Sequence, residues 1–501
     1  MQLLAREFAE RAERAPGDVA VIDALGTHTV GDVMAAAREL AGALEESLGG
    51  SPTVLVQADN TWRTLATALA VGLRGGMVAV LSSHAVASEL ELAMEDIEPD
   101  AVVASGEVLA HWAVSTAAFP DKRAVLDGWA LVTSGRPSSD VARWSGGVAV
   151  AMTSGSTGRP KCVVQSEEAL RYADRSTIDA IGLEPGDAVG AFVPLSSVAA
   201  FCFGMYLPAM LGGPMVCIES WQPDAALDAM ADHDVRWTML VPTMALQLSI
   251  RPTAEGRLAG LRAMTVGGGP MDAGALGRAE EILGTKLIRV FGMSECLGHT
   301  TTRPDEDAGT RLACDGRPFP GTVVRAVDDG GRPLPVGEVG AAQVRGPSMF
   351  VGYARSGRPQ PPELTDDGFL PTGDLVRVND AGTITVLGRQ KQIIIRGGRN
   401  IDVNEVEAAL ARVPSVAQVC VVPVPDEMLG ERVAALVVST GPALGLAEIT
   451  GQLAAAGFPK GKWPEFVFAV PDLPQNRVGK LSRPDAVRIA TELRAASRGV
   501  T

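Results

Sequence analysis

Short apolar runs alternate with amphipathic segments over most of the chain. Apolar residues that recur at intervals of three and four predict helices, whereas uninterrupted apolar runs predict buried strands. Helices are expected at residues 5–14, 30–48, 61–72 and 89–97, and strands at 54–56, 77–81, 101–104, 148–152, 189–192, 214–218, 237–241, 263–266 and 287–290. This alternation favours parallel sheets covered by helices.

The pattern changes after about residue 310, where glycine, proline and short β-branched runs become frequent. Asp-Gly and Gly-Gly pairs follow the run 322–327 and are typical of hairpins, so a small antiparallel β unit is expected. From residue 419 strands and helices alternate on a shorter scale. The predicted fold class is α/β: a large N-terminal domain, residues 1–388, of parallel-type sheets covered by helices plus the small β unit, and a small α+β C-terminal domain, residues 389–501.

The charge balance excludes one broad class of partner. The 501 residues contain 44 Lys and Arg against 59 Asp and Glu, which gives a net charge of −15. A chain this acidic lacks the basic footprint of a nucleic-acid-binding protein, and aromatic residues, at 4%, are too few for base-stacking platforms. No nucleic-acid partner is expected.

The cysteines and the apolar segments bear on the compartment. The six cysteines form no CxxC pair and no metal-ligand spacing with the five histidines, so neither a disulfide nor a structural metal is expected. No apolar stretch follows the charged N-terminus, and the apolar region 65–82 is interrupted by Arg74-Gly75-Gly76. We therefore expect a cytoplasmic protein with no signal peptide and no membrane span.

The segment with the clearest chemistry is Thr153-Ser154-Gly155-Ser156-Thr157-Gly158-Arg159-Pro160-Lys161, which follows the strand predicted at 148–152. Its two glycines permit close approach of the backbone to a ligand, its hydroxyls and N–H groups can surround a polyphosphate, and Lys161 adds a positive charge. It is not a Walker A loop, because Pro160 stands where a glycine would precede the lysine. A Ser/Gly-rich surface loop is the alternative interpretation.

Three further motifs are weak when each is taken alone. Phe291-Gly292-Met293-Ser294-Glu295 offers a hydroxyl for a phosphate and a carboxylate for a divalent cation, although a plain strand-to-helix turn is the commoner interpretation. Asp374, in Thr372-Gly373-Asp374, suits the two hydroxyls of a ribose but is also a common turn residue. The fourth motif, residues 474–480, is a loop that ends in Gly479-Lys480.

Taken together and in this order, the four motifs resemble those of the adenylate-forming superfamily, which includes AMP-dependent acyl-CoA synthetases, adenylation domains and luciferase-type enzymes. Gly267-Gly268-Gly269-Pro270 is similar to the turn beside the adenine in that family. Further similar segments are Gly337-Glu338-Val339-Gly340, Gly352-Tyr353 and Arg396-Gly397-Gly398-Arg399-Asn400-Ile401, which is followed by Glu405-Val406-Glu407. In that last segment, Asn404 and Glu407 also fit an N-x-x-E capping box for the following helix.

The resemblance implies a two-step reaction with ATP, Mg²⁺ and coenzyme A. A carboxylate attacks the α-phosphate to give acyl-AMP and pyrophosphate, and a thiol then attacks the acyl-AMP while a mobile C-terminal domain rotates. Lys480 would bridge the carboxylate and phosphate oxygens as the catalytic lysine. Thr153, Lys161 and the loop between them would hold the phosphates. Ser294 would bind the α-phosphate, Glu295 would coordinate Mg²⁺, and Phe291, followed by Gly292 and Met293, would stack on the adenine.

The same resemblance gives roles to residues around the domain boundary. Asp374 and Arg389 would bind the ribose hydroxyls, and Lys391 would be the hinge residue. Gly397 and Gly398 would line the channel for the pantetheine arm, where the absence of a Cβ lets the arm pass.

The acid pocket is expected to contain mostly apolar or small residues, although several of them could simply belong to the core. Ser197 replaces the histidine or aromatic residue usual in Pro-Leu-x-His. No acidic residue occurs in 193–206 to pair with an ammonium group, so a free α-amino acid is an unfavourable substrate. His299 could contact the substrate or be a satisfied structural histidine. The expected pocket comprises Ser197, Phe201, Phe203, Gly204, Gly267, Cys296, Leu297 and His299.

Three functions remain open at this point. The first is an acid:CoA ligase acting on a hydrophobic carboxylic acid: aryl, alicyclic, terpenoid or medium-chain fatty. The second shares the adenylation step but transfers the acyl group to a carrier-protein thiol. The third is a non-catalytic member that binds nucleotide, which the intact set of motif residues disfavours. A kinase or GTPase is excluded chiefly by the missing Walker A loop.

Overall fold

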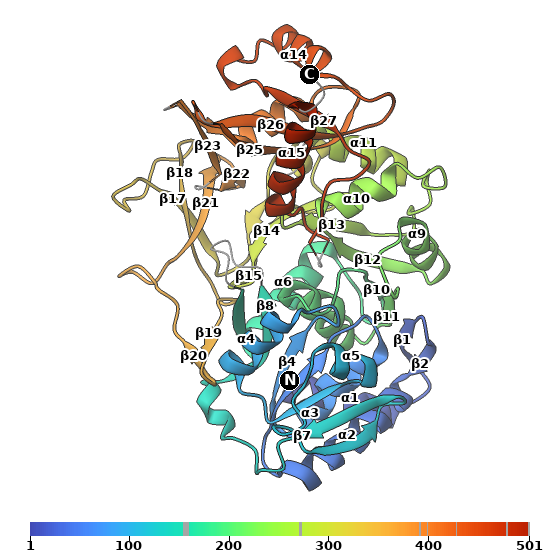
Figure 1. Ribbon diagram of the computed structural model, residues 1–501. Coiled ribbons are helices and arrows are strands. Elements are labelled where there is room, and N and C mark those ends of the chain that lie inside the picture. The colour runs from blue at the N-terminus through green and yellow to red at the C-terminus, as the bar shows by residue number, and fades with distance from the viewer. Residues whose placement is uncertain are drawn as a thin grey trace.

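The computed structural model describes residues 1–153, 160–269, 273–389, 392–397, 399–426, 428–476 and 479–498. Figure 1 shows the N-terminal part of the chain at one end of the molecule and the C-terminal part at the other, beside α10 (Pro242–Ser249) and α11 (Ala273–Leu283). Two large mixed sheets form the main body, and strands from the N-terminal part of the chain belong to both of them.

The first large sheet has nine strands among the described residues. Six neighbouring strands are parallel, and antiparallel strands close both edges. In spatial order they are β16 (Arg317–Pro318), β15 (Cys296–Thr301), β14 (Leu287–Met293), β13 (Ala263–Gly267), β12 (Val235–Leu240), β10 (Ala188–Ala191), β11 (Met215–Cys217), β1 (Val19–Asp23) and β2 (Gly26–Thr29).

The second large sheet also has nine described strands, with a parallel centre. Every residue of its strand Met77–Leu81 is buried, as expected for a continuous apolar run covered on both faces. In order the strands are β20 (Arg358–Gln360), β19 (Gly352–Arg355), β9 (Lys161–Ser166), β8 (Gly147–Thr153), β4 (Met77–Leu81), β3 (Thr53–Gln57), β5 (Ala101–Ser105), β7 (Trp129–Thr133) and β6 (Asp121–Val125).

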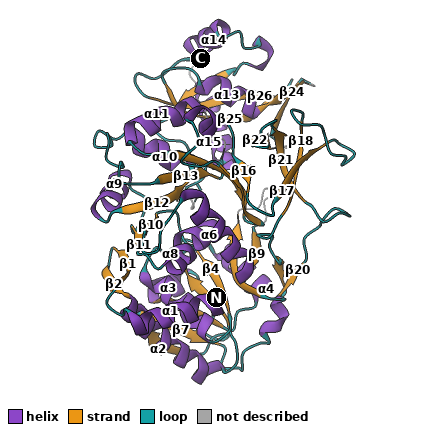
Figure 2. Cartoon of the chain, turned by 180° about the vertical axis from the view of Figure 1, so that it is seen from behind, coloured by secondary structure: helices purple, strands orange, loops and turns teal. Residues whose placement is uncertain are grey.

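Helices cover both sheets and fill the space between them. The helix α6 (Glu167–Ile181) contacts β8 and β9 of one sheet and β15 of the other, and Figure 2 shows it in the middle of the molecule. The remaining helices of this part are α1 (Gln2–Arg14), α2 (Val30–Leu48), α3 (Trp62–Leu73), α4 (Ala87–Ile97), α5 (Gly106–His111), α7 (Val198–Ala200), the π-helix η2 (Phe201–Tyr206), α8 (Leu207–Leu211), α9 (Pro223–Asp232) and α12 (Ala308–Ala313), with the 3₁₀ turn η1 (Val141–Trp144).

Local sequence accounts for several of these boundaries. The hydroxyl of Thr29 accepts a hydrogen bond from the backbone N–H of Asp32, whose carboxylate in turn accepts from Thr29, so a capping box starts α2. Gly49 ends this helix with a φ of 62°, which glycine adopts without strain. The helix expected at 30–48 and the strand expected at 77–81 are confirmed residue for residue.

Two smaller sheets follow. The antiparallel unit expected after residue 310 is confirmed as four strands in the order β17 (Val323–Val327), β18 (Val339–Arg345), β21 (Leu370–Val378) and β22 (Ile384–Arg389). The last part of the chain has β23 (Ile393–Arg396), β24 (Arg399–Asp402), β25 (Val416–Asp426), β26 (Gly430–Ser439) and β27 (Phe466–Ala469), with α13 (Val403–Ala411), α14 (Leu446–Ala455), the 3₁₀ turn η3 (Lys460–Lys462) and α15 (Arg483–Arg498).

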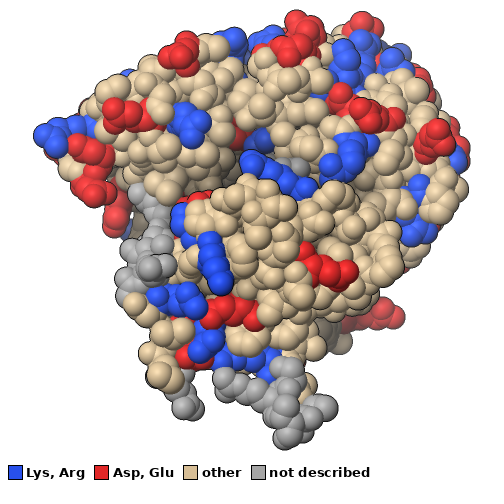
Figure 3. Space-filling view, turned by 90° about the horizontal axis from the view of Figure 1, so that it is seen from above, with Lys and Arg blue, Asp and Glu red and all other residues tan. Residues whose placement is uncertain are grey.

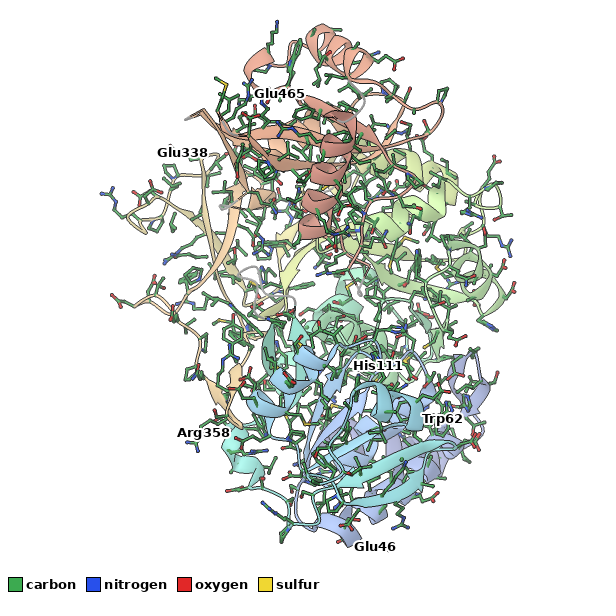
Figure 4. All side chains as sticks on the ribbon, viewed as in Figure 1. Glu46, Trp62, His111, Glu338, Arg358 and Glu465 are labelled. Atoms are coloured by element: carbon green, nitrogen blue, oxygen red, sulfur yellow. The ribbon has the colours of Figure 1, made fainter. Side chains whose placement is uncertain are left out.

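Ion pairs tie the C-terminal sheet together. Glu465, labelled in Figure 4, lies 2.9 Å from the Arg396 guanidinium on β23 and 3.1 Å from that of Arg432 on β26. The capping box expected from Asn404 and Glu407 is wrong. Asp402 caps α13 instead, whereas the Glu407 carboxylate pairs with Arg483 at 2.8 Å.

The surface and the cysteines add little to the functional picture. Figure 3 shows acidic and basic side chains interspersed on the face that carries the C-terminal part. All six cysteines lie in the described ranges and are buried, and no disulfide joins any two of them. Within the described ranges, no helix is both long and apolar enough to cross a membrane.

Candidate active site

The Lys480 side chain lies against the turn that follows β13. A Cβ atom placed on Gly268 would be 2.9 Å from Cε and 3.0 Å from Nζ of Lys480, which is closer than real Cβ contacts allow. Gly268 also has a φ of +84°, so the backbone of the turn favours glycine, and a side chain at this position would displace the end of Lys480. The fold thus brings together the fourth motif and the Gly267–Gly269 turn, which are far apart in the sequence.

Charged groups from two other elements surround this ammonium. Although the Lys480 side chain is exposed to solvent, the surrounding protein desolvates the ammonium and lowers its pKa, and Arg389 lowers this pKa further. The Glu295 carboxylate opposes this shift. Lys480, Arg389 and Glu295 are therefore close enough to interact electrostatically.

Ser294 and Glu295 lie at the tip of a β-hairpin. Strands β14 and β15 pair in antiparallel fashion with Met293 opposite Cys296, so the strand-to-helix turn expected here is wrong. The side-chain amide of Gln165 donates a 2.7 Å hydrogen bond to the carbonyl of Ser294 and holds the tip against β9. A Cβ at Gly292 would lie 2.9 Å from the backbone nitrogen of Gly298. The backbones of β14 and β15 therefore approach too closely at this point for a side chain on Gly292.

Tyr353 links two of the expected site residues. Its hydroxyl donates a 2.8 Å hydrogen bond to Oε1 of Glu295 and lies 3.4 Å from Nζ of Lys161, which also sits over the tyrosine ring. Burial and the Glu295 charge raise the pKa of Tyr353 well above its usual range. Gly352-Tyr353 is one of the segments that resemble the family, but the sequence gives Tyr353 no role. No signal in the sequence joined it to Glu295.

Asp374 and Arg389 face each other across β21 and β22. Their Cα atoms are register partners, and Nε of Arg389 lies 2.8 Å from Oδ1 of Asp374. Burial raises the pKa of Asp374 whereas Arg389 lowers it, and the backbone N–H of Asp374 donates to the Thr372 hydroxyl. The pair presents one carboxylate and one partly exposed guanidinium near Lys480, a donor and acceptor set suited to vicinal hydroxyls.

The expected acid-pocket residues form a buried apolar region. Phe201, Phe203 and Gly204 lie on the π-helix η2, a rare conformation that often occurs at functional sites. Phe203 and Phe319 fill most of the space beside Gly298 and leave a cavity of about 20 Å³, which has room for about one water molecule. The Ser197 hydroxyl caps α7 by accepting from the N–H of Ala200. Cys296 and Leu297 are buried at the start of β15.

His299 is fully buried, and neither of its ring nitrogens has a hydrogen-bond partner of good geometry among the described residues. The carbonyl of Cys296 raises its pKa slightly, but burial dominates and lowers this pKa to about 3. The ring packs edge-on against Phe291, with centroids 4.6 Å apart. His299 is therefore a neutral imidazole, and its contact with Phe291 is the described contact of its ring.

One acidic side chain beside η2 was missed from the sequence because it comes from α6. Asp174 is fully buried and accepts a hydrogen bond from the Cys202 thiol at 3.2 Å, and its second oxygen has no hydrogen-bond partner among the described residues. Burial raises its pKa well above the usual range, while the Cys202 thiol and Arg171 lower it. The prediction against α-amino acids depends on the absence of an acidic residue in 193–206, and it stays a prediction.

The remaining expected residues fall into two groups. Thr153 and Lys161 are register partners at the ends of β8 and β9, and Gly397 lies in the turn after β23, where its N–H donates to Leu429. Within the described ranges no contact joins Gly397 to Lys480. The other expected residues lie outside the described part of the chain: Ser154, Gly155, Ser156, Thr157, Gly158, Pro270, Lys391 and Gly398.

The fold brings Lys480 from the C-terminal part beside Gly268, within electrostatic reach of Arg389 and Glu295. Residues 8–354 match the model of the AMP-binding enzyme family, and residues 405–480 match that of the AMP-binding enzyme C-terminal domain. The chain belongs to the family of AMP-binding enzymes.

Individual relatives agree with this assignment. The chain is 32% identical to the salicylyl-CoA synthase / salicylate adenylyltransferase of a Streptomyces species, over 95% of this chain and 91% of that protein. It is 31% identical to the medium-chain fatty-acid–CoA ligase of Escherichia coli, over 67% of this chain and 60% of that protein. The crystal structure of ATP-bound MatB from Rhodopseudomonas palustris superposes with a TM-score of 0.81 at 26% identity, covering 98% of this chain and 99% of that one.

These matches confirm the predicted superfamily, the α/β fold class and the activity of an ATP-dependent, AMP-forming acid ligase. The boundary expected at residue 388 stays a prediction, as do the roles of individual site residues.

Proposed function

We propose that this protein is an acid:CoA ligase that activates a hydrophobic carboxylic acid in two steps at the site around Lys480. In the first step a carboxylate oxygen attacks the α-phosphorus of ATP, the bond from that phosphorus to the bridging oxygen breaks, and pyrophosphate leaves. In the second step the thiol sulfur of coenzyme A attacks the acyl carbon, its proton passes to solvent, and AMP leaves.

The observation that carries this proposal is the position of Lys480 beside Gly268, within electrostatic reach of Arg389 and Glu295. Two anions must meet in the first step, so most of the catalysis is positioning and charge neutralisation. A lysine supplied by a separate unit can bridge the carboxylate and the α-phosphate and then be withdrawn before the thiol enters. Asp374 and Arg389 would hold the ribose, and Phe291 would stack on the adenine.

The site also fits a magnesium ion. Among the described residues Glu295 has a hydrogen bond from Tyr353 on one carboxylate oxygen only, so the other oxygen is available at the hairpin tip. Mg²⁺ is commonly held by one carboxylate together with substrate phosphates. Glu295 would hold the ion, which when bound neutralises phosphate charge, while Lys161 and Ser294 would contact phosphate oxygens directly.

The nature of the acid follows from the apolar residues around η2 and β15. Phe201, Phe203 and Leu297 are buried and favour an aryl or alkyl body. The names of two relatives, a salicylate enzyme and a medium-chain fatty-acid ligase, lie within the same range of hydrophobic acids. Aryl, alicyclic, terpenoid and medium-chain fatty acids are therefore the candidates.

The test is an ATP–pyrophosphate exchange screen over such acids, beginning with salicylate and octanoate, followed by detection of the acyl-CoA product. We expect exchange with at least one acid and thioester formation when coenzyme A is added. No exchange with any hydrophobic acid contradicts the adenylation of this class. Accumulation of acyl-AMP with coenzyme A, relieved only by a holo-carrier protein, assigns the second step to a carrier instead.

A further inference from the structure

The loop that carries Lys480 rests on the first turn of α10. The hydroxyl of Thr243 donates a 2.8 Å hydrogen bond to the carbonyl oxygen of Gly479, across 236 residues of sequence. Thr243 belongs to the N-terminal body of the molecule, whereas Gly479 immediately precedes the lysine. The contact therefore joins the two parts directly beside Lys480, the residue expected to be catalytic.

The backbone of Gly479 approaches this helix unusually closely. A Cβ atom on Gly479 would lie 2.6 Å from Cε of Met244 and 3.5 Å from Cγ2 of Val241. Gly479 also has a φ of +74°, which disfavours every residue with a side chain. Its carbonyl can reach the Thr243 hydroxyl because no side chain separates the two backbones.

The loop transmits this contact to the lysine. The backbone N–H of Asn476 donates to the carbonyl of Lys480 at 2.7 Å, and the N–H of Lys480 donates to the side chain of Asn476 at 2.9 Å. Both hydrogen bonds join Asn476 to the backbone of Lys480. A contact that holds Gly479 therefore also holds the Lys480 backbone, from which the side chain extends. The ammonium then reaches Gly268.

We propose that Thr243 is a positioning residue for the adenylation step alone, a role that rests on the proposed function of Lys480. Its hydroxyl holds the lysine loop in the orientation seen here. That bond has to break if the C-terminal part turns away to admit the thiol. Removal of the hydroxyl therefore weakens the first step and leaves the second step unchanged or faster.

The test compares three variants in the two half-reactions. Thr243→Val removes the donor while keeping the shape, Thr243→Ser restores it, and Ser249→Ala removes a hydroxyl that bonds only within the same helix, to Leu246. ATP–pyrophosphate exchange measures the first half-reaction, and thioester formation from synthetic acyl-AMP and coenzyme A measures the second.

We expect exchange to fall about 3- to 10-fold in Thr243→Val, the contribution of one neutral hydrogen bond, with thioester formation not reduced. Thr243→Ser should recover most of the exchange rate, and Ser249→Ala should match the wild type in both assays. Equal exchange in Thr243→Val and wild type overturns this role, and so does a parallel loss in both half-reactions. A wild type that shows no exchange with any acid overturns the proposed function and, with it, this role.

Discussion

The hydroxyl of Tyr353 donates a 2.8 Å hydrogen bond to Glu295 and so ties strand β19 to the tip of the β14–β15 hairpin. The backbone N–H of Phe350 donates to the carbonyl of the same glutamate at 2.8 Å. Two contacts from one segment thus fix both the backbone and the carboxylate of the residue expected to hold Mg²⁺.

Replacement of Tyr353 by phenylalanine should therefore weaken magnesium binding without unfolding the protein. The carboxylate loses a charge-assisted hydrogen bond, which corresponds to roughly a tenfold rise in the Mg²⁺ concentration needed for half-maximal exchange. Titration of exchange activity with Mg²⁺ measures this change. Tyr172→Phe is the control, because the Tyr172 hydroxyl bonds to Pro320 and Thr322, not to the hairpin. The same Mg²⁺ dependence in Tyr353→Phe and wild type would contradict the role of Tyr353.

Substitution of Lys480 by alanine should abolish exchange while the fold persists. The ammonium makes no described ion pair that holds the structure together, so its loss removes charge neutralisation and not stability. Exchange activity and the melting temperature are the two measurements. Lys462→Ala serves as the control because Lys462 pairs with Glu405 in the same C-terminal part. Surviving exchange in Lys480→Ala would show that another group performs the chemistry.

Gly268→Ala should displace the Lys480 ammonium and lower the exchange rate by at least about tenfold, because small misplacements of a catalytic group are costly. The new Cβ would overlap Cε and Nζ of the lysine, both at the mobile end of the side chain, so the ammonium has to move. Gly331→Ala is matched for strain, since Gly331 has a φ of +76° with no atom within 4 Å of the added Cβ. An exchange rate in Gly268→Ala equal to that of Gly331→Ala would contradict this explanation.

His299 should make the protein less stable as the pH falls. Its pKa is about 3 in the folded state, below its ordinary value of 6.5. Between these two pH values His299 is protonated in the unfolded state but neutral in the folded state, so the unfolded state is favoured as the pH falls. This group is neutral in both states above pH 6.5, and its destabilising effect grows by roughly 1.4 kcal/mol per pH unit below that value. His299→Phe should flatten the pH dependence of the free energy of unfolding between pH 6.5 and 5. An unchanged slope would mean that His299 titrates normally in the folded protein.

Much of the secondary structure followed from local pattern alone. The apolar run 77–81 could only be a buried strand, and Val30–Leu48 carried both its capping box and its terminal glycine. The turn at Ser294-Glu295 was assigned wrongly because the short segment after it contains glycine, histidine and threonine, which have no clear period. Pairing with β14 decided that this segment is a strand.

Tertiary partners also overrode a correct-looking local motif. Asn404 and Glu407 have the spacing of a capping box, yet Glu407 pairs with Arg483 and accepts a hydrogen bond from Val421. Two charge-assisted partners hold that carboxylate more strongly than a helix terminus does. Asp402 was then left to cap the helix.

The family, the order of the motifs and the residue types suited to adenylation can all be predicted from residue identity and spacing along the chain. The tertiary structure decided which of them meet. Only the packing of the C-terminal part on α10 brings Gly479 to Thr243 and Lys480 to Gly268, and only the pairing of β19 with β9 brings Tyr353 beside Lys161. Such contacts depend on sheet register and on the burial of distant surfaces against each other, and neither is encoded in any short segment.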